Sequence, residues 1–220
     1  MRFTLLASAV TAAALSTSAQ AATIDFNAPD IQGMVVTSVS STDGTITAAL
    51  TADGGADQAL VFDTTQENTE DRDLEDPFRP AADSNAAAVV SPGGVLIIQE
   101  TLNGAPDDNQ TGGSIAFAFN RSVNFTGFKI FDGAEITVSS STFQQTFAVP
   151  EPNSEEDRVF DTFSTAGLFD NVRDLTFTFA GSGAIDDIQV SAVPVPASLP
   201  LLLAGLGGLG WAARRRRKAA

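Results

Sequence analysis

The sequence predicts an all-β domain, folded as a two-sheet antiparallel sandwich with a jelly-roll-like arrangement of strands. Three observations support this prediction. Apolar and polar residues alternate along many short segments, as at Ile115, Phe117 and Phe119, which is typical of strands with one buried face. Turn signals such as Asp43-Gly44 and Gly112-Gly113 separate these segments. No window has the sustained periodicity of an amphipathic helix.

The alternation and the turn signals together give the bounds of the expected strands. In chain order these are residues 23–27, 34–40, 45–51, 59–62, 95–100, 114–119, 125–131, 136–139, 143–149, 158–161, 175–179 and 184–190. Eleven or twelve short strands in a domain of this size favour a sandwich. The sequence has 16 Phe and no Tyr, so we expect phenylalanine to fill the core.

Composition limits the possible functions of the domain. The 220 residues suffice for one domain plus processing segments, and 43% of them are hydrophobic. All 27 acidic residues lie between Asp25 and Asp187, where only six basic residues accompany them, a formal charge of −21. Such a surface repels nucleic acid, so we expect no nucleic-acid partner. The absence of His removes the commonest general base and the commonest transition-metal ligand.

The first 21 residues have the organisation of a secretory signal peptide. Arg2 supplies the positive charge, and an Ala-rich apolar run follows it from Leu5 to Leu15. This run is too short to span a bilayer, and Ala19-Gln20-Ala21 is a small-x-small cleavage signal. We expect cleavage after Ala21, with Ala22 as the alternative, which leaves an acidic β-sandwich domain at residues 22–191.

Residues 192–220 form a three-part tail. The sequence Val193-Pro194-Val195-Pro196-Ala197 precedes an apolar stretch from Leu199 to Ala213. This stretch is short for a full span, but Val193 to Ala213 together approach the ~20 residues that a bilayer requires, which predicts a single transmembrane helix. A basic stub follows, and it predicts a membrane stop with the domain outside and the stub inside. The stub consists of Arg214, Arg215, Arg216, Arg217 and Lys218.

These three parts, in this order, resemble the VPLPA-CTERM class of sorting signal, a relative of PEP-CTERM. The resemblance implies export, transient anchoring in the inner membrane, and processing by an exosortase-like membrane protease. It also implies a Gram-negative bacterium that makes exopolysaccharide, and a final location in the cell envelope or the extracellular matrix. Val195 stands where the class usually has Leu. A second Pro-Glu-Pro, within Val149–Pro152, has no apolar stretch after it and is expected to be a loop.

Acidic residues gather in two predicted loops. The long segment 63–94 contains Asp71 and Asp73, and the segment before Gly112-Gly113 contains Asp107 and Asp108. Clustered carboxylates are the oxygen donors that calcium prefers, so these residues are candidate calcium ligands. A solvated, flexible acidic loop is the simpler interpretation of the long segment, and both interpretations stay open.

A further candidate ligand comes from a second resemblance. The early segment Ile24-Asp25-Phe26 and the closing segment Ile185-Asp186-Asp187-Ile188 resemble secreted galactose-binding-like jelly rolls. In such domains a structural calcium often sits near the paired first and last strands. The resemblance therefore implies Asp187 or Asp186 as a ligand.

The sequence leaves three functions open. The leading hypothesis is a non-enzymatic cell-surface or matrix protein that is associated with exopolysaccharide and stabilised by calcium. The second is a carbohydrate-binding module for exopolysaccharide, although the domain lacks the Trp and Tyr that often form sugar-binding platforms. The third is a polysaccharide hydrolase or lyase, for which Glu100 or Glu135 would be the nominated carboxylate. We expect no catalytic residues.

Overall fold

The computed structural model describes residues 20–81, 89–132, 135–149, 158–193, 202, 205–209 and 214. It divides the chain into a compact unit, Gln20–Val193, and a second unit that contains the two terminal segments. The strands that the structure describes, and both clusters of buried apolar side chains, lie in Gln20–Val193. This unit therefore carries its own core.

The compact unit is built from strands, which confirms the all-β prediction. Eleven strands are described, and their bounds in chain order are β1 Ala21–Ile24, β2 Ser38–Ser40, β3 Thr47–Asp53, β4 Ala59–Asp63, β5 Arg79–Pro80, β6 Gly94–Ile98, β7 Gly113–Phe131, β8 Glu135–Ser139, β9 Gln144–Ala148, β10 Val159–Phe179 and β11 Ala184–Ala192.

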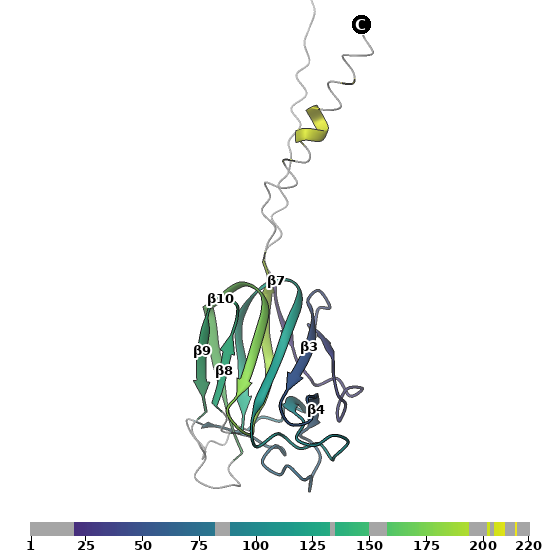
Figure 1. The fold of residues 1–220 in the computed structure, drawn as a ribbon, viewed down its shortest axis with the longest axis vertical. Coiled ribbons are helices and arrows are strands. Elements are labelled where there is room, and N and C mark those ends of the chain that lie inside the picture. The colour runs from purple at the N-terminus through teal and green to yellow at the C-terminus, as the bar shows by residue number, and fades with distance from the viewer. Residues whose placement is uncertain are drawn as a thin grey trace, which may run out of the picture. The chain divides into compact units, whose positions relative to one another are not determined.

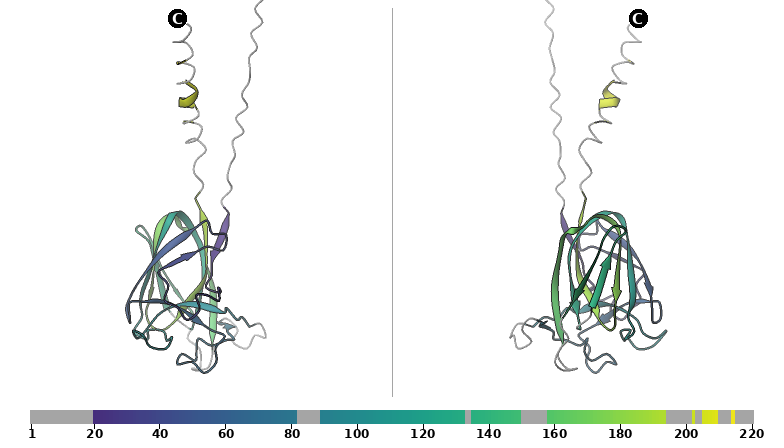
Figure 2. Two further views of the ribbon diagram at one scale, coloured as in Figure 1. Left: turned by 90° about the vertical axis from the view of Figure 1, so that its right-hand side faces the viewer. Right: turned by 60° about the vertical axis from the view of Figure 1, so that its left-hand side comes forward.

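Hydrogen bonds join these strands into one curled sheet, where the sequence predicted two separate sheets (Figures 1 and 2). The main path is β4-β6-β11-β7-β10-β8-β9, while β1 pairs with β11, β2 with β3, and β3 with β7. Nearly all described pairs are antiparallel. The two-residue strand β5 is the exception, because it pairs in parallel with β10.

The single sheet arises because β7 and β10 are much longer than the sequence predicted. Each spans two of the expected strands, and the two halves of each have different neighbours. In the middle of β10 the register shifts repeatedly, and the buried residues Phe169, Val172 and Leu175 are three positions apart. These bulges break the period-two pattern, so the alternation could not be followed through this stretch.

The paired strands β7 and β10 form one long two-stranded ribbon, and its two halves pack against each other through phenylalanine rings. The Phe177 ring, on β10, lies 5.7 Å from that of Phe125 and 5.4 Å from that of Phe128, both on β7. Phenylalanine supplies nine of the twelve largest fully buried side chains, which confirms the expected Phe-rich core. Edge-to-face contacts such as Phe125–Phe177 are the favourable geometry for paired rings.

The long segment between β4 and β6 is in part packed. Its residues Leu74 and Phe78 are completely buried and belong to a second, smaller core cluster with Phe62 and Phe131. The described part of this segment therefore differs from the solvated loop that was the alternative interpretation. Phe62, before Asp71 and Asp73, and Leu74, after them, are both buried, and these two anchors hold the acidic residues near the end of the sheet.

The two ends of the compact unit lie side by side. β1 pairs antiparallel with the end of β11, with Ala21 opposite Ser191. Figure 2 shows both ends leaving the sheet at the same place. The longer loops between strands gather at the opposite end of this unit, below β4 in Figure 1.

In the tail, the structure describes helical conformation at residues 202, 205–209 and 214. No helix among the described residues has the length and apolar character needed to cross a membrane. The transmembrane helix expected from the sequence therefore stays a prediction.

Candidate functional site

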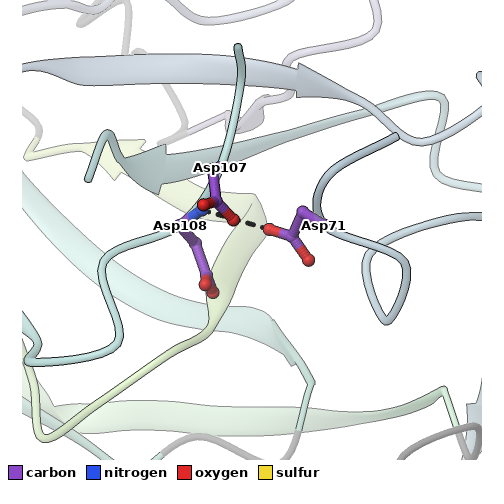
Figure 3. A group of neighbouring side chains, drawn as sticks. All are labelled: Asp71, Asp107 and Asp108. Atoms are coloured by element: carbon purple, nitrogen blue, oxygen red, sulfur yellow. Dashed lines mark hydrogen bonds between the residues drawn. The ribbon is translucent and has the colours of Figure 1, made fainter. Parts of the chain in front are cut away.

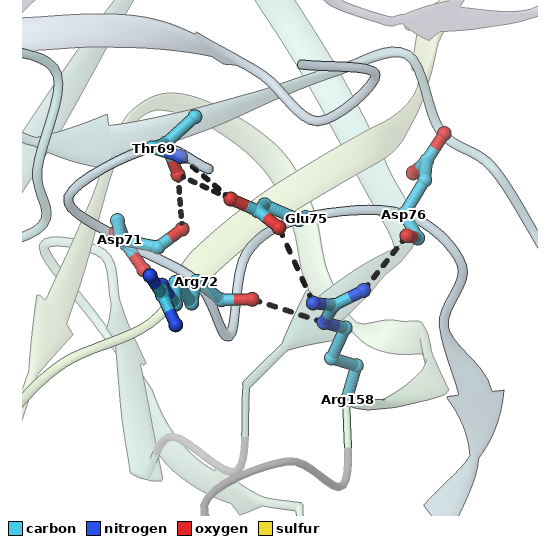
Figure 4. Close-up of polar contacts among 6 residues, drawn as sticks. All are labelled: Thr69, Asp71, Arg72, Glu75, Asp76 and Arg158. Atoms are coloured by element: carbon cyan, nitrogen blue, oxygen red, sulfur yellow. Dashed lines mark hydrogen bonds and ion pairs between the residues drawn. The ribbon is translucent and has the colours of Figure 1, made fainter. Parts of the chain in front are cut away.

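The acidic residues of the long segment are positioned by Arg158, which lies directly before β10. Its guanidinium group donates hydrogen bonds to the carbonyl oxygens of Arg72 at 2.9 Å and Asp76 at 2.8 Å. It also pairs with Glu75 Oε2 at 3.3 Å (Figure 4). The other oxygen of Glu75 accepts a hydrogen bond from the Thr69 N–H at 2.7 Å. The segment that carries Asp71 is therefore tied to the sheet through an extensive set of polar contacts.

The second acidic segment folds around the side chain of Gln99, which is 2% exposed. Its amide donates to the carbonyl oxygens of Thr101 at 3.1 Å and Ala105 at 2.7 Å. Its Oε1 accepts from the Asp107 N–H at 3.3 Å. Because Gln99 satisfies these backbone groups, the loop presents Asp107 and Asp108 at a fixed place.

The two segments meet at Asp71 and Asp108. The N–H of Asp108 donates to Asp71 Oδ2 at 3.1 Å (Figure 3). The Asp108 carboxylate in turn accepts hydrogen bonds from Ser182 Oγ at 2.7 Å and from the Gly183 N–H. Ser182 and Gly183 directly precede β11, so three distant parts of the chain converge here.

Three carboxylates form the centre of this site, and we call them the aspartate triad: Asp71, Asp107 and Asp108. One carboxylate oxygen from each lies within 4.8 Å of the other two. Asp71 and Asp108 are each only 4% exposed. Among the described residues, the two ion pairs are Arg158–Glu75 and Lys129–Asp187, so neither involves the triad.

Burial and mutual repulsion oppose ionisation of the triad. Burial is the largest cause that raises the pKa of Asp71 to about 10; a hydrogen bond with Asp73 and the charges of Asp108 and Asp73 add to it. Burial also raises the pKa of Asp107 to about 6, helped by a hydrogen bond with Glu100 and the charge of Glu100. The pKa of Asp108 is raised by burial, although hydrogen bonds from Ser182 and Gly183 lower it in part.

The triad opens onto a cleft of ≈ 780 Å³. The cleft combines carboxylates with hydrogen-bond donors, and it is lined by Glu70, Asp71, Arg72, Asp73, Asp107, Asp108, Gln110, Arg158 and Ser182. Carboxylate, amide and hydroxyl groups together can bind a hard cation or the hydroxyl groups of a sugar.

Four of the five predicted calcium ligands line this cleft, and Asp187 does not. Asp187 lies on β11 at a bulge, with a positive φ of 51°, and forms an ion pair with Lys129 at 2.6 Å. Its neighbour Asp186 is 1% exposed, and its Oδ1 has no hydrogen-bond partner among the described residues. Burial, followed by the charge of Asp187, raises the pKa of Asp186 to about 7, although a backbone hydrogen bond acts in the opposite direction.

Sequence reasoning identified the acidic segments but missed the residues that assemble them. Ser182 donates a hydrogen bond to Asp108, and Arg158 holds the segment of Asp71. Glu100 raises the pKa of Asp107 through a hydrogen bond and its charge. The sequence signal for Ser182 was present, because it precedes a strand beside an acidic pair. No local pattern could pair it with Asp108, which is 74 residues away.

The sorting and cleavage residues fall largely outside the described part of the chain. This holds for Ala19, for Pro194, Val195, Pro196 and Ala197, and for Arg215, Arg216, Arg217 and Lys218. Ala21 is the first residue of β1, and the Val193 N–H donates to the Ser122 carbonyl at 3.2 Å. Arg214 is helical and exposed.

Comparison with protein families places a sorting signal in the tail. Residues 192–217 match the family described as the PEP-CTERM protein-sorting motif. The match confirms the resemblance found in the sequence. The motif indicates an exported protein that is transiently anchored in the membrane before an exosortase-type system processes it.

A comparison with curated proteins found no match. Among solved structures, the carbohydrate-binding module TmCBM61, in complex with beta-1,4-galactotriose, is 12% identical with a TM-score of 0.31, over 66% of this chain and 88% of that chain. The GH115 4-O-methyl-alpha-glucuronidase BtGH115A, specific for decorated arabinogalactans, is 13% identical with a TM-score of 0.27. It is matched over 53% of this chain and 17% of its own length.

Proposed function

We propose that this exported protein is a non-enzymatic component of the cell surface or extracellular matrix, and that its aspartate triad binds calcium. The observation that carries the proposal is the burial of Asp71 and Asp108 within 4.8 Å of each other and of Asp107. Buried carboxylates at this separation repel one another strongly. Either protons or a cation must neutralise them.

Calcium fits the donors at this place. It takes six to eight oxygen ligands, whereas zinc and copper sites usually include His or Cys, and this sequence has neither. The triad supplies carboxylate oxygens, and Asp73 and Glu70 line the same cleft. Calcium bound there would neutralise the repulsion between the two loops and hold them together.

The proposed location is the exopolysaccharide layer, reached through the sorting signal at residues 192–217. The aspartate triad lies at one end of β11, where Ser182 and Gly183 bind Asp108, and the sorting signal begins at the other end of this strand. The acidic end would therefore be available to the matrix while the tail is engaged by the exosortase-like protease.

One observation favours carbohydrate binding as a second function. The cleft beside the triad also contains Arg72, Gln110 and Ser182. Such a mixture of donors and acceptors can bind sugar hydroxyl groups, with or without calcium. Binding of purified exopolysaccharide in EDTA would favour a metal-independent carbohydrate module.

The calcium proposal is tested on residues 22–193, which contain both core clusters. The thermal midpoint is measured in EDTA, in millimolar calcium, and in sodium chloride of equal ionic strength. Calcium at one hundred times its dissociation constant stabilises a folded protein by about 2.7 kcal/mol, which corresponds to roughly 5–11 °C here. We expect this shift in the wild type and in the exposed-site control Asp174→Asn, and its loss in Asp71→Asn/Asp108→Asn. Equal midpoints in EDTA and calcium would refute the proposal.

The non-enzymatic part of the proposal has its own test. Purified exopolysaccharide is incubated with the protein in calcium, and the release of reducing ends or of unsaturated products is measured. We expect no release above that of a heat-denatured sample. Release that Glu100→Gln abolishes would instead establish a hydrolase or lyase.

A further inference from the structure

The strand β9 forms an edge of the curled sheet. It pairs with β8 over its full length, with Gln144 opposite Ser139 and Ala148 opposite Glu135. Among the described strands, no other pairs with β9, and it ends the main path of the sheet (Figure 1). One side of its backbone is therefore without a strand partner in the described part of the chain.

The ladder geometry identifies which backbone groups point away from β8. The Ser140 N–H donates to the Phe143 carbonyl at 2.8 Å, so these two residues form a hydrogen-bonded pair. Hydrogen-bonded and non-hydrogen-bonded pairs alternate in an antiparallel ladder. The N–H and C=O groups of Gln144, Thr146 and Ala148 therefore point to the free edge. The Thr137–Thr146 hydroxyl contact of 2.8 Å agrees, because side chains are closer in non-hydrogen-bonded pairs.

The strand β9 has no charged residue, and Glu135, at the start of β8, is the one charged residue of the β8–β9 hairpin. Residues 136–149 contain no Asp, Glu, Lys or Arg, although the domain between Asp25 and Asp187 has a formal charge of −21. Exposed edge strands are usually protected from pairing by charged side chains, proline or bulges. Gln144, Gln145, Thr146 and Ala148 are all exposed, and none provides such protection.

We propose that β9 is a self-association edge, which pairs antiparallel with β9 of a second copy of this chain. A second copy fits because an uncharged strand can lie against itself without repulsion between like charges. The acidic charge elsewhere on the domain opposes association through its other surfaces. A two-fold axis at Thr146 places Thr146 opposite itself and Gln144 opposite Ala148. All three outward-facing residues then exchange backbone hydrogen bonds with their partners.

One side chain has to move for this pairing to form. The Gln145 amide donates to the Thr146 carbonyl at 3.0 Å and covers that acceptor at the free edge. Strand addition replaces this contact with an N–H from the partner. Because five-residue strands contribute few bonds, the association is weak and depends on the high local concentration of a membrane-anchored protein.

The test follows association of residues 22–193 at physiological salt, where charge repulsion is screened beyond about 8 Å. Sedimentation velocity and amide hydrogen exchange are measured from micromolar to millimolar protein. The weight-average mass should rise toward twice the monomer mass. Exchange at Gln144, Thr146 and Ala148 should slow in proportion to the dimer fraction.

Variants of Thr146 separate this edge from other surfaces. Thr146→Pro removes a donor that makes no bond to β8, and Thr146→Glu places like charges on both copies. Both should remain monomeric at every concentration. Thr178→Glu makes the same change at an exposed residue of β10, between β7 and β8, and should still associate.

Three outcomes would overturn the proposal. The first is a constant monomer mass with concentration-independent exchange at the three amides. The second is association that survives in both Thr146 variants, which would place the interface elsewhere. The third is protection of the three amides only when exopolysaccharide is added, which would make a glycan the occupant of the edge. Thermal midpoints confirm that each variant is folded.

Discussion

The backbone N–H of Asp108 donates a hydrogen bond to the side chain of Asp71 at 3.1 Å, across 37 residues of sequence. This bond joins the two acidic segments, and it brings two buried carboxylates together. Asp71 therefore contributes an attractive contact and an unfavourable charge at once, and the two effects respond differently to substitution.

The substitution Asp71→Asn should stabilise the protein without calcium and abolish its response to calcium. The amide oxygen can still accept the Asp108 N–H, and the neutral Asn side chain does not have to take up a proton when the protein folds. Because the pKa of Asp71 is raised to about 10 in the folded state, the wild type loses stability as pH rises from about 4 toward 10. At pH 8 in EDTA we expect a gain of up to about 5 kcal/mol in the free energy of unfolding, because about 1.4 kcal/mol is lost by the wild type for each pH unit above the unfolded pKa. Urea unfolding in EDTA and in calcium measures both effects. A loss of stability in EDTA would contradict the account.

A second pH-dependent contribution comes from Asp186. Its pKa is raised to about 7, so the wild type is stabilised below the unfolded pKa and loses stability as pH rises through about 4 to 7. Asp186→Asn should remove this dependence, with a relative gain of roughly 2–4 kcal/mol at pH 8 compared with pH 4. Urea unfolding across this range measures the slope. Asp161→Asn, on β10, is the control for the loss of one carboxylate group.

Arg158 should be important for the stability of the acidic end. Arg158→Ala removes the cation that pairs with Glu75, a residue that is only 6% exposed. The carbonyl oxygens of Arg72 and Asp76 also lose a hydrogen-bond donor. We expect a loss of about 2–4 kcal/mol, with little rescue by Arg158→Lys, because only a guanidinium can reach all three acceptors. Arg173→Ala, at an exposed residue, should change stability by less than about 0.5 kcal/mol. Equal effects of the two alanine variants would contradict this role.

The phenylalanine core offers a test of the packing. Phe125 is completely buried and its ring contacts those of Phe128, Phe169 and Phe177. Phe125→Ala should cost about 3–5 kcal/mol. Phe143 is 38% exposed and its ring contacts that of Phe169, so Phe143→Ala should cost less than half as much. Chemical denaturation measures both, and similar losses would mean that Phe125 does not join the two halves of the ribbon.

The sorting motif gives a prediction in the native host. Replacement of Val193–Ala197 by alanines should leave the protein in the membrane with an uncut tail, because the exosortase-type system no longer recognises it. Mass spectrometry of the C-terminus and cell fractionation measure this outcome. The same replacement at Val149–Pro152, which also contains Pro-Glu-Pro, should leave processing unchanged. Normal processing of the first variant would exclude these residues as the recognition element.

The sequence predicted the class of the fold but not its connectivity. Alternation at Ile115, Phe117 and Phe119 identified a strand, yet the pattern is interrupted at the exposed Arg121 and resumes at Val123. An interruption of this kind looks the same whether a strand ends or bends. Only the non-local pairing of β7 with β10 distinguishes the two possibilities, and no local pattern encodes it.

The candidate site was predictable as separate pieces. Asp71, Asp107 and Asp108 were identified from local acidic density, which depends only on neighbouring residues. Their convergence depends on the buried anchors Leu74 and Phe78 and on tertiary contacts of high sequence separation. Asp187 lies apart from this cleft and pairs with Lys129, on the neighbouring strand β7, so its role as a calcium ligand stays a prediction.

The strand β11 has a mechanical consequence. It begins beside Ser182 and Gly183, which hold Asp108, and it ends at Ala192, where the sorting signal starts. If the acidic end binds the matrix while the tail is still anchored, tension runs lengthwise along this strand. The hydrogen bonds to β1 and β7 are then sheared together rather than opened one by one. We therefore expect high resistance to pulling between Asp107, in the acidic loop, and Ala192, at the end of β11, which single-molecule force spectroscopy can compare with pulling across β9.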